Sequence, residues 1–274
     1  MGTSRPRGRF AGRTELEPAS HDELPGGAEQ YSHREVNKQS WLRSFGRRKG
    51  RKLSESQSSL LSDDLERLKI DLSARVDAGR LAQIFSSPVD DVWLEIGFGA
   101  GEHLIWQAEH NPRVGLIGAE PYINGVVSTL AAARERDLED RLRIHPEDAI
   151  PLLDWLPAAS LARAFMLFPD PWPKTRHRTR RLFSPFLLDK LSRVLSPGAE
   201  FRFASDIASY VDAAIGHAEA HPAFGIVQVF TSKDRATVPD WPATRYEAKA
   251  VRAGRSATFL VMKRKAGPLP GPEG

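Results

Sequence analysis

A chain of 274 residues, 41% of them hydrophobic, is long enough for one large α/β domain with a sizeable core and additional extensions. It has no cysteine, which excludes disulfides, thiolate zinc sites and cysteine nucleophiles. The net charge of +4 is unevenly distributed: residues 1–52 carry twelve Lys/Arg against six Asp/Glu, and the remaining residues carry 27 against 29.

Both ends of the chain are predicted to be disordered. Residues 1–42 are rich in Gly, Pro, Arg and Glu without apolar periodicity, and residues 265–274 are rich in Pro and Gly. Residues 43–264 are expected to form one domain. No apolar run approaches the roughly 20 residues that cross a bilayer, and the N-terminus lacks the apolar core of a signal peptide, so we expect a soluble, cytoplasmic protein.

The domain is expected to begin with a basic segment. Residues 43–52 read R-S-F-G-R-R-K-G-R-K and hold six positive charges and no acid. Trp41 and Phe45 are near enough to stack on bases or to pack on the domain. The segment is typical of a phosphate-binding extension, and a solvated linker is the alternative. Leucines at helical spacing over residues 54–68 then predict a helix that packs on the domain.

The most ordered pattern lies at residues 92–101, which read V-W-L-E-I-G-F-G-A-G. Residues that suit a buried strand lead directly into alternate glycines, and residues 102–111 follow with a helical pattern. The stretch predicts a strand, a tight turn and a helix start. Because glycine has no Cβ, the turn at Gly97 and Gly99 can approach a bound ligand closely. The alternative is a tight turn that serves only the fold.

Three details favour S-adenosylmethionine as the ligand of this turn. Glu102 stands where a dinucleotide fingerprint has its third glycine, and its charge would repel a pyrophosphate. Glu95, two residues before the first glycine, can hold an ammonium through charge-assisted hydrogen bonds. A second strand over residues 114–119 ends in Glu120. At this position a carboxylate can accept hydrogen bonds from the two hydroxyls of a ribose. S-adenosylmethionine has the ammonium, the sulfonium and the ribose that these details require.

The following elements continue a strand–helix alternation. A helix over residues 123–137 precedes a strand over residues 142–145, and residues 161–168 form a further apolar strand. This alternation predicts an α/β fold with a doubly wound, mostly parallel sheet. Asp148 follows the third strand, where it can accept a hydrogen bond from an adenine amino group. The alternative role for Asp148 is the N-cap of a helix over residues 149–156.

The fourth strand is followed by P-D-P-W-P-K-T-R-H-R-T-R-R, residues 169–181. Its prolines fix φ and cannot continue the strand, so they hold Asp170 and Trp172 in a rigid loop at the carboxyl edge of the sheet. A second basic cluster follows these residues. A turn that served only the fold would not require this concentration of positive charge. The cluster consists of Lys174, Arg176, His177, Arg178, Arg180 and Arg181.

The last third of the domain predicts further helices and strands. They are a helix over residues 182–195, a strand over 200–204 that ends in Ser205 and Asp206, a helix over 207–220, and strands over 224–230 and 257–263. A long loop is expected between the last two strands, and it contains T-R-Y-E, residues 244–247. Loops of this length in a compact domain are usually functional or disordered.

These stretches together resemble the bacterial tRNA (guanine-N7-)-methyltransferases of the TrmB type, a Rossmann-like class I methyltransferase family. The matching motifs span residues 45–263. They are F-G-R-R-K-G-R from Phe45, L-E-I-G-F-G-A-G from Leu94, F-P-D-P-W-P-K-T-R-H from Phe168, A-S-D from Ala204 and T-R-Y-E from Thr244. Many methyltransferases share the glycine turn, whereas P-D-P-W-P-K-x-R-H with a later T-x-Y/F-E is highly specific.

The resemblance implies methyl transfer from S-adenosylmethionine to N7 of a guanine in the tRNA variable loop. It implies Asp170 as the catalytic candidate, and cofactor contacts from Glu95, Gly97, Gly99, Glu120, Asp148 and Asp170. It implies substrate contacts from Lys174, Asp206, Thr244, Arg245, Tyr246 and Glu247, with RNA contacts from Arg176, His177, Arg178, Arg180 and Arg181. Thr179 stands where the family usually has a lysine, so one phosphate contact is missing. We expect no metal and no obligate protein partner, and either a monomer or a homodimer.

Two other functions are compatible with the sequence. D-P-W-P is distantly similar to the D-P-P-Y turn of methylases that modify base amino groups, so a base amino group of RNA is an alternative methyl acceptor. The chain could also be a non-catalytic RNA-binding subunit with a methyltransferase fold. Intact acids at Glu95, Glu120 and Asp170 argue against that second alternative.

Overall fold

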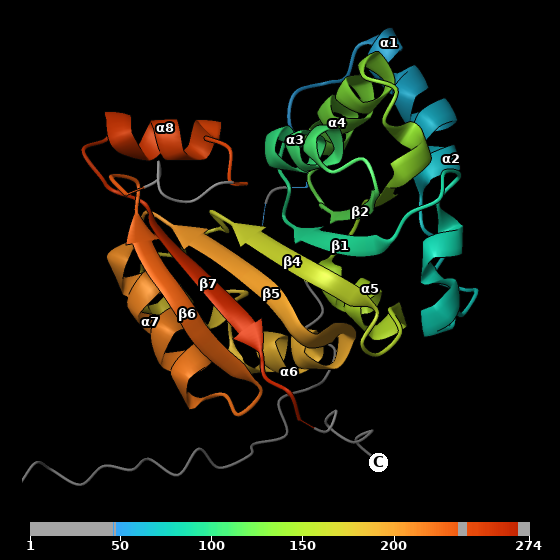
Figure 1. The fold of residues 1–274 in the computed structure, drawn as a ribbon. Coiled ribbons are helices and arrows are strands. Elements are labelled where there is room, and N and C mark those ends of the chain that lie inside the picture. Colours follow the sequence, from blue (N-terminus) through green and yellow to red (C-terminus); the bar gives the residue numbers. More distant parts are fainter. Residues whose placement is uncertain (1–45, 47, 235–239, 268–274) are drawn as a thin grey trace, which may run out of the picture. The chain divides into compact units, whose positions relative to one another are not determined.

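Seven strands among the described residues form one sheet, in the order β3-β2-β1-β4-β5-β7-β6 (Figure 1). The computed structural model describes residue 46, residues 48–234 and residues 240–267. The extension expected over residues 1–42 lies outside the described part, as do residues 268–274 of the expected tail. The strands are β1 Asp91–Ile96, β2 Val114–Ala119, β3 Leu142–His145, β4 Leu161–Leu167, β5 Leu195–Ser205, β6 Phe224–Thr231 and β7 Thr258–Arg264.

Strands β1 to β5 are parallel to one another, and β7 lies antiparallel between β5 and β6. The predicted doubly wound, mostly parallel sheet is therefore confirmed. The chain builds β1, β2 and β3 outward in one direction and then returns to place β4 on the other side of β1. Ligands of such folds bind at the carboxyl edge where the strand order reverses, which here is the junction between β1 and β4.

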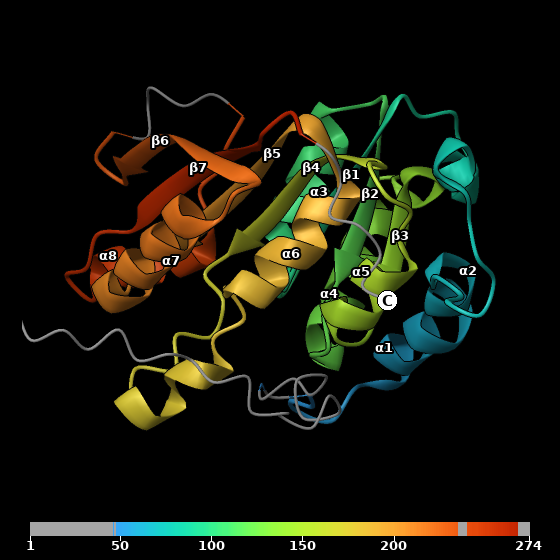
Figure 2. The same ribbon diagram turned by 90° about the horizontal axis from the view of Figure 1, so that it is seen from below.

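Helices cover both faces of the sheet (Figure 2). Their bounds are α1 Glu55–Ser59, α2 Glu66–Leu68, α3 Glu102–His110, α4 Ile123–Glu135, α5 Ala149–Trp155, α6 Pro185–Val194, α7 Ala208–Ala220 and α8 Arg245–Arg252. Buried residues of α3 and α4 belong to one hydrophobic cluster, and those of α5, α6 and α7 belong to the cluster on the opposite face. Each strand in the centre of the sheet is thus buried from both sides, as its continuous apolar sequence predicts.

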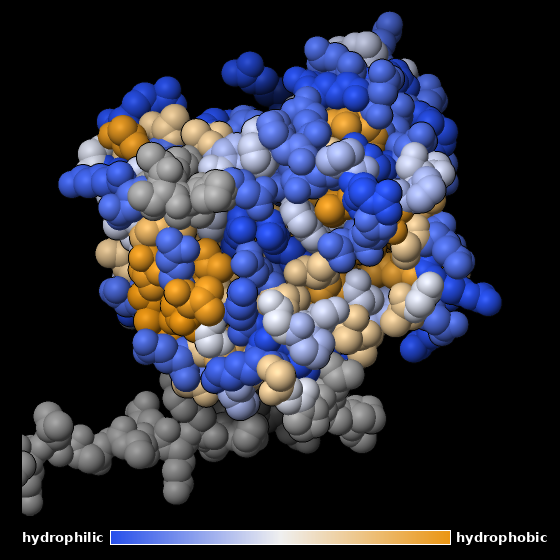
Figure 3. Space-filling model, in the orientation of Figure 1, coloured by the Kyte–Doolittle hydropathy of each residue, from blue (hydrophilic) through white to orange (hydrophobic). Residues whose placement is uncertain are grey.

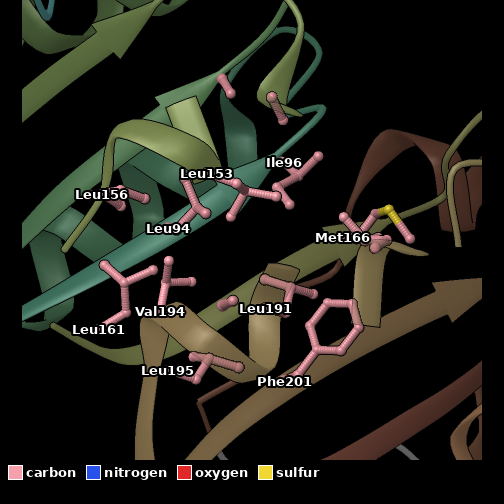
Figure 4. Packing of buried hydrophobic residues seen from close by; sticks show 14 of the residues in the cluster. Leu94, Ile96, Leu153, Leu156, Leu161, Met166, Leu191, Val194, Leu195 and Phe201 are labelled. Atoms are coloured by element: carbon pink, nitrogen blue, oxygen red, sulfur yellow. The ribbon is translucent and has the colours of Figure 1, made fainter. Parts of the chain in front are cut away.

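Figure 4 shows the second of these clusters at close range. Leu94 of β1 lies beside Leu153 of α5, and Phe201 of β5 lies beside Leu191 of α6; Met166 of β4 belongs to the same cluster. The leucines and Phe201 have no accessible surface, so each contributes about 1.5–3 kcal/mol through burial alone. This packing fixes the strand ends from which the polar residues of the carboxyl edge project.

The predicted N-terminal helix over residues 54–68 is formed, with a π-helical stretch at Leu60–Leu65 between α1 and α2. Ser54 begins it with a capping box, because its hydroxyl accepts a hydrogen bond from the Gln57 N–H while the Gln57 side chain accepts one from the Ser54 N–H. Its buried Asp64 forms ion pairs with Arg67 and with Arg134 of α4. The pair with Arg134 attaches the helix to the domain.

Three elements differ from the sequence prediction. The expected long loop between the last two strands contains α8, which Thr244 caps by accepting a hydrogen bond from the Glu247 N–H at 3.3 Å. A 3₁₀ turn at Thr175–Arg180 lies within the basic loop. Strand β5 begins at Leu195 and not at residue 200, because Leu195 pairs with Leu161 beside a register shift.

One side of the molecule is shown as a surface in Figure 3, where hydrophobic residues gather over β6 and β7. Strand β6 is the edge of the sheet, and its Val227 and Val229 are about half exposed. A sheet edge with exposed valines can pair with another chain. None of the helices in the described ranges has the length and apolar character that crossing a membrane requires.

The packing of α4 against the glycine turn yields the first prediction. A Cβ added at Gly125 would collide with the carbonyl oxygen of Gly99, which is backbone and cannot move away cheaply. We expect Gly125→Ala to lower the free energy of unfolding by about 1–3 kcal/mol, because the turn must shift to admit the methyl group. Chemical denaturation measures this change.

Gly216→Ala is the matched control, because Gly216 lies exposed in α7 with nothing within 4 Å of an added Cβ. There the methyl group should stabilise the protein by about 0.4–1 kcal/mol through the unfolded chain. Equal effects of the two substitutions would show that the α4 contact does not constrain the turn.

Candidate active site at the carboxyl edge of the sheet

The glycine turn after β1 has a backbone conformation that would be strained in residues with a side chain. Gly97, Gly99 and Gly101 have φ values of 73°, 59° and 81°, in the left-handed region that favours glycine. The turn is fixed by hydrogen bonds from the Gly97 N–H to the Ala119 carbonyl at 2.8 Å and from the Gly101 N–H to the Phe98 carbonyl at 2.9 Å. An added Cβ at Gly97 would meet nothing within 4 Å, so open space adjoins the turn at that point.

Glu120, directly after β2, is held against this turn. Its Oε2 accepts a hydrogen bond from the Gly99 N–H at 2.7 Å, and its Oε1 accepts one from the Tyr122 N–H at 2.8 Å. Burial raises the pKa of the Glu120 carboxyl, and the two N–H groups oppose that shift. The negative charges of Asp170 and Glu95 raise the pKa of Glu120 further.

Three carboxylates from the ends of β1, β2 and β4 therefore lie near one another. Burial is the larger cause of the raised Glu120 pKa, but the additional effect of Asp170 and Glu95 shows that the electrostatic potential here is negative, which favours a positively charged ligand. Asp170 is exposed, and its carboxylate has no hydrogen bond or ion pair with another described residue. Glu95 is buried and accepts a hydrogen bond from its neighbour His103 at 2.8 Å.

A cleft opens between the glycine turn, the end of β4 and the start of α8. It is lined by Glu95, Gly97, Phe98, Ala100, Glu102, His103, Leu167, Phe168, Thr244 and Tyr246. In Figure 1, α8 lies beyond the carboxyl end of β4, on the same edge as the turn. Of the expected site residues, the structure thus brings Glu95, Gly97, Thr244 and Tyr246 to one cleft.

The T-R-Y-E segment reaches the glycine turn from the other end of the domain. The Tyr246 hydroxyl would lie 3.0 Å from a Cβ added at Gly99, and its ring lies nearly parallel to that of Phe168 with centroids 6.3 Å apart. The Arg245 N–H donates to Glu102 Oε2 at 3.0 Å, and its guanidinium lies 3.4 Å from Oε1 of the same carboxylate. Glu102, which argued against a pyrophosphate, therefore anchors α8.

The loop after β4 is held by its own backbone and by Arg181. Phe168 and Trp172 have positive φ values of 52° and 39°, which residues other than glycine rarely adopt and which are concentrated at functional sites. The Arg181 guanidinium donates to the Pro171 carbonyl at 3.0 Å and to both the carbonyl and the hydroxyl of Ser209, at 2.7 and 3.0 Å. Burial lowers the pKa of Arg181, which also lies over the Tyr210 ring.

The basic cluster of this loop divides into an outer and an inner part. Lys174, Arg176 and Arg178 are exposed. Arg180 lies over the Trp172 ring at 5.0 Å, and His177 packs against the same ring. Arg181 was expected among the RNA contacts, but it is only 8% exposed and its donors bind the loop, so its position is that of an anchor.

Glu120 and Asp170 lie outside the cleft lining, as do Asp148 and Asp206, whose carboxylates pair with arginines. The Asp148 carboxylate pairs with Arg48 at 3.3 Å, and although Asp148 occupies the N-cap position of α5 its side chain makes no cap hydrogen bond. The Asp206 carboxylate accepts a hydrogen bond from Arg255 at 2.8 Å. Neither side chain lines the cleft, and the ligand contacts expected of them remain predictions.

The described part of the basic segment is attached to the domain at the start of α4. The Gly50 N–H donates to the Asn124 side chain at 2.7 Å, whose Nδ2 donates back to the Arg51 carbonyl at 2.9 Å. The Ile123 N–H donates to the Arg48 carbonyl at 3.0 Å. These bonds favour a fixed extension over a solvated linker for residues 48–51, and the charged side chains of that stretch are exposed.

Known proteins similar in sequence to this chain are methyltransferases. The family model described as "Putative methyltransferase" matches residues 90–260. A tRNA (guanine-N(7)-)-methyltransferase of Paramagnetospirillum magneticum is 48% identical over 225 residues, which cover 82% of this chain and 93% of that protein. The tRNA (guanine-N(7)-)-methyltransferase of Mesorhizobium japonicum is 45% identical over 81% of this chain and 94% of its own length.

The chain belongs to the tRNA (guanine-N(7)-)-methyltransferase family. The resemblance seen in the sequence motifs is thereby confirmed. Among solved structures, a 16S rRNA methyltransferase, KamB, aligns over 70% of this chain and 95% of its own, with 18% identity and a TM-score of 0.47.

Two site residues of this family member gave no signal in the sequence. His103 lies in the first turn of α3, directly after the glycines, and a single histidine in a helix is more often a packed core residue than a functional one. Phe168 ends an apolar strand, where an aromatic residue is ordinary. Both line the cleft, and only the fold brings them together with Glu95 and Tyr246.

The contrast between inner and outer arginines gives the second prediction. Arg181→Ala should lower the free energy of unfolding by about 1–3 kcal/mol, because three partly buried acceptors lose their donor. Arg178→Ala is the control, since Arg178 is exposed, and should change stability by less than about 0.5 kcal/mol. Thermal unfolding of both variants measures the difference, and an unchanged Arg181→Ala variant would contradict the anchoring role.

Proposed function

We propose that this protein transfers a methyl group from S-adenosylmethionine to N7 of a guanine in the variable loop of tRNA. The observation that carries the proposal is the group of three carboxylates, Glu95, Glu120 and Asp170, around the glycine turn at the strand-order reversal. The names of the relatives support the acceptor, and the exposed cations in the loop after β4 suit an RNA backbone.

The residues present fit the proposed cofactor. The open space beside Gly97 lets a ligand approach the backbone, and the negative surroundings of Glu120 favour a cation. Glu95 would hold the ammonium, and Glu120 would hold the ribose hydroxyls with the lone pairs that its two N–H donors leave available. When bound, S-adenosylmethionine supplies an electrophilic methyl group on a positively charged sulfur.

The acceptor places few chemical demands on the protein. Guanine N7 has an in-plane lone pair exposed on the major-groove edge, so no base is needed to remove a proton. Catalysis then depends on positioning, and alignment of the reacting atoms can lower the barrier by on the order of 7 kcal/mol. Phe168 and Trp172 provide the rigid loop for this task, since their backbone conformations and the prolines leave it little freedom.

Asp170 is the residue of this loop that we assign to catalysis. Positive charge moves onto the purine as N7 accepts the methyl group, and a preorganised carboxylate stabilises it. Asp170 is exposed at the carboxyl edge and close enough to Glu120 to raise the pKa of that carboxyl. Its carboxylate can accept hydrogen bonds from the N–H edge of the guanine or orient the methyl donor.

The reaction itself is tested with unmodified tRNA and isotope-labelled S-adenosylmethionine, followed by mass spectrometry of the nucleosides. We expect labelled 7-methylguanosine, at which mild reduction followed by aniline cleaves the RNA chain. A label in an amino-methylated base, which resists that cleavage, would establish the alternative acceptor. Absence of any label, together with absence of cofactor binding in calorimetry, would support the non-catalytic RNA-binding subunit.

The catalytic assignment gives a separate prediction for two variants. Asp170→Ala should reduce single-turnover methylation by about 10²–10³-fold, since it removes a preorganised charge that acts in the transition state. Asp170→Asn should fall between the wild type and Asp170→Ala, because the amide keeps an acceptor oxygen and loses the charge. Both should keep the wild-type melting temperature, as the Asp170 carboxylate bonds to no other described residue.

Asp212→Ala serves as control, because Asp212 is an exposed acid on α7. Its turnover should remain within about twofold of the wild type. If Asp170 only stabilises its loop, both Asp170 variants will melt earlier and methylate at near-normal rates, which would refute the catalytic role.

A further inference from the structure

His103 lies at the centre of a buried chain of polar groups behind the cleft. Its side chain is 2% exposed and stands edge-on to the Phe165 ring, with centroids 4.6 Å apart. Its Nδ1 lies 2.8 Å from Glu95 Oε2, and its Nε2 lies 3.1 Å from Nε2 of Gln107, one turn further along α3. These hydrogen-bonded side chains thus connect the carboxylate near the end of β1 with the buried face of α3.

The orientation of the Gln107 amide is fixed by two neighbours, one that can only accept a hydrogen bond and one that can only donate one. Its nitrogen donates to the backbone carbonyl of Asp240 at 3.3 Å, and a carbonyl can only accept. Its oxygen accepts from Asn111 Nδ2 at 3.0 Å, and that same nitrogen also donates to the Gln107 backbone carbonyl at 2.9 Å. Turning the amide over would place oxygen against oxygen at Asp240 and nitrogen against nitrogen at Asn111.

This orientation determines the protonation of His103. Because the Gln107 nitrogen donates, His103 Nε2 must accept and carries no hydrogen. The ring hydrogen is therefore on Nδ1, which donates to Glu95 Oε2. A neutral imidazole orients the carboxylate without cancelling its charge, whereas an imidazolium would form an ion pair with it. The second oxygen of Glu95 has no partner among the described residues.

We propose that His103 is a positioning residue that fixes the orientation of Glu95, with one carboxylate oxygen left available for the ammonium of the cofactor. The inference rests on the proposed function and goes beyond it, because it assigns the orientation of the carboxylate to one histidine tautomer. His103 and Glu95 both line the cleft, so the pair is in place to act on a ligand there. Gln107 sets the tautomer and needs no contact with the ligand.

The test compares two ligands that differ in the ammonium. S-adenosylhomocysteine carries the amino-acid group, and 5′-methylthioadenosine lacks it. His103→Leu should weaken calorimetric binding of S-adenosylhomocysteine about tenfold or more, because the hydrogen bond that orients a charged group is lost. Binding of 5′-methylthioadenosine should change by less than about twofold. His103→Asn, which can keep a donor near the Nδ1 position, should restore most of the affinity for S-adenosylhomocysteine.

His110→Leu is the matched control, because His110 is exposed on the last turn of the same helix and stacks on Trp106. It should bind both ligands like the wild type. Equal losses for both ligands in His103→Leu would show a merely structural role and overturn the proposal, as would no loss at all. Failure of the wild type to bind either ligand would instead refute the proposed function itself.

Nitrogen NMR of the imidazole gives a readout that is independent of any ligand. We expect the signals of a neutral ring protonated on Nδ1 for His103 at neutral pH. Gln107→Leu should remove the constraint on Nε2 and allow the other ring forms. Detection of an imidazolium, or of a ring protonated on Nε2, in the wild type would overturn the proposal.

Discussion

The hydrogen bond from the Gly99 N–H to Glu120, 2.7 Å long, ties together the two strand ends on which the site depends. Gly99 adopts a positive φ in the tight turn that presents this N–H to the end of β2. The same glycine has the start of α4 against its carbonyl oxygen, at Gly125, and the Tyr246 hydroxyl beside its α carbon. Elements from residues 95 to 246 thus converge on one peptide unit, and a side chain there would displace several of them at once.

The loop after β4 solves a different problem, that of holding an exposed carboxylate still. Asp170 has no hydrogen bond of its own within the described part of the chain, so its position must come from the backbone on either side. The unusual φ values of Phe168 and Trp172 supply part of that constraint, and Arg181 supplies the rest by bonding to the Pro171 carbonyl. An anchor of this kind explains why a cluster that looks uniformly basic in the sequence contains one arginine that faces inward.

Much of this arrangement follows from the sequence alone. The bounds of β3 and the parallel order of the early strands were predictable, because long apolar runs alternate with helical patterns and leave little freedom. The helix α8 was not, since R-Y-E-A-K-A-V-R has few apolar residues and is stabilised by the Thr244 cap and by Glu102 far away in the chain. The burial of individual polar side chains could not be predicted either. The pattern of charges in the sequence does not distinguish the buried Arg181 from the exposed Arg178, and it does not identify His103 as the partner of Glu95.

Under the proposed function, charges of opposite sign on one edge of the sheet interact with two different parts of the substrate. The three carboxylates around the turn repel phosphates, and the exposed Lys174, Arg176 and Arg178 attract them. An RNA backbone is therefore held outside the cleft, where it releases counterions from the cations. A guanine base is neutral and can enter the acidic cleft, provided it leaves the stack. The positive charge that methylation then places on the base is the charge that these carboxylates are arranged to stabilise.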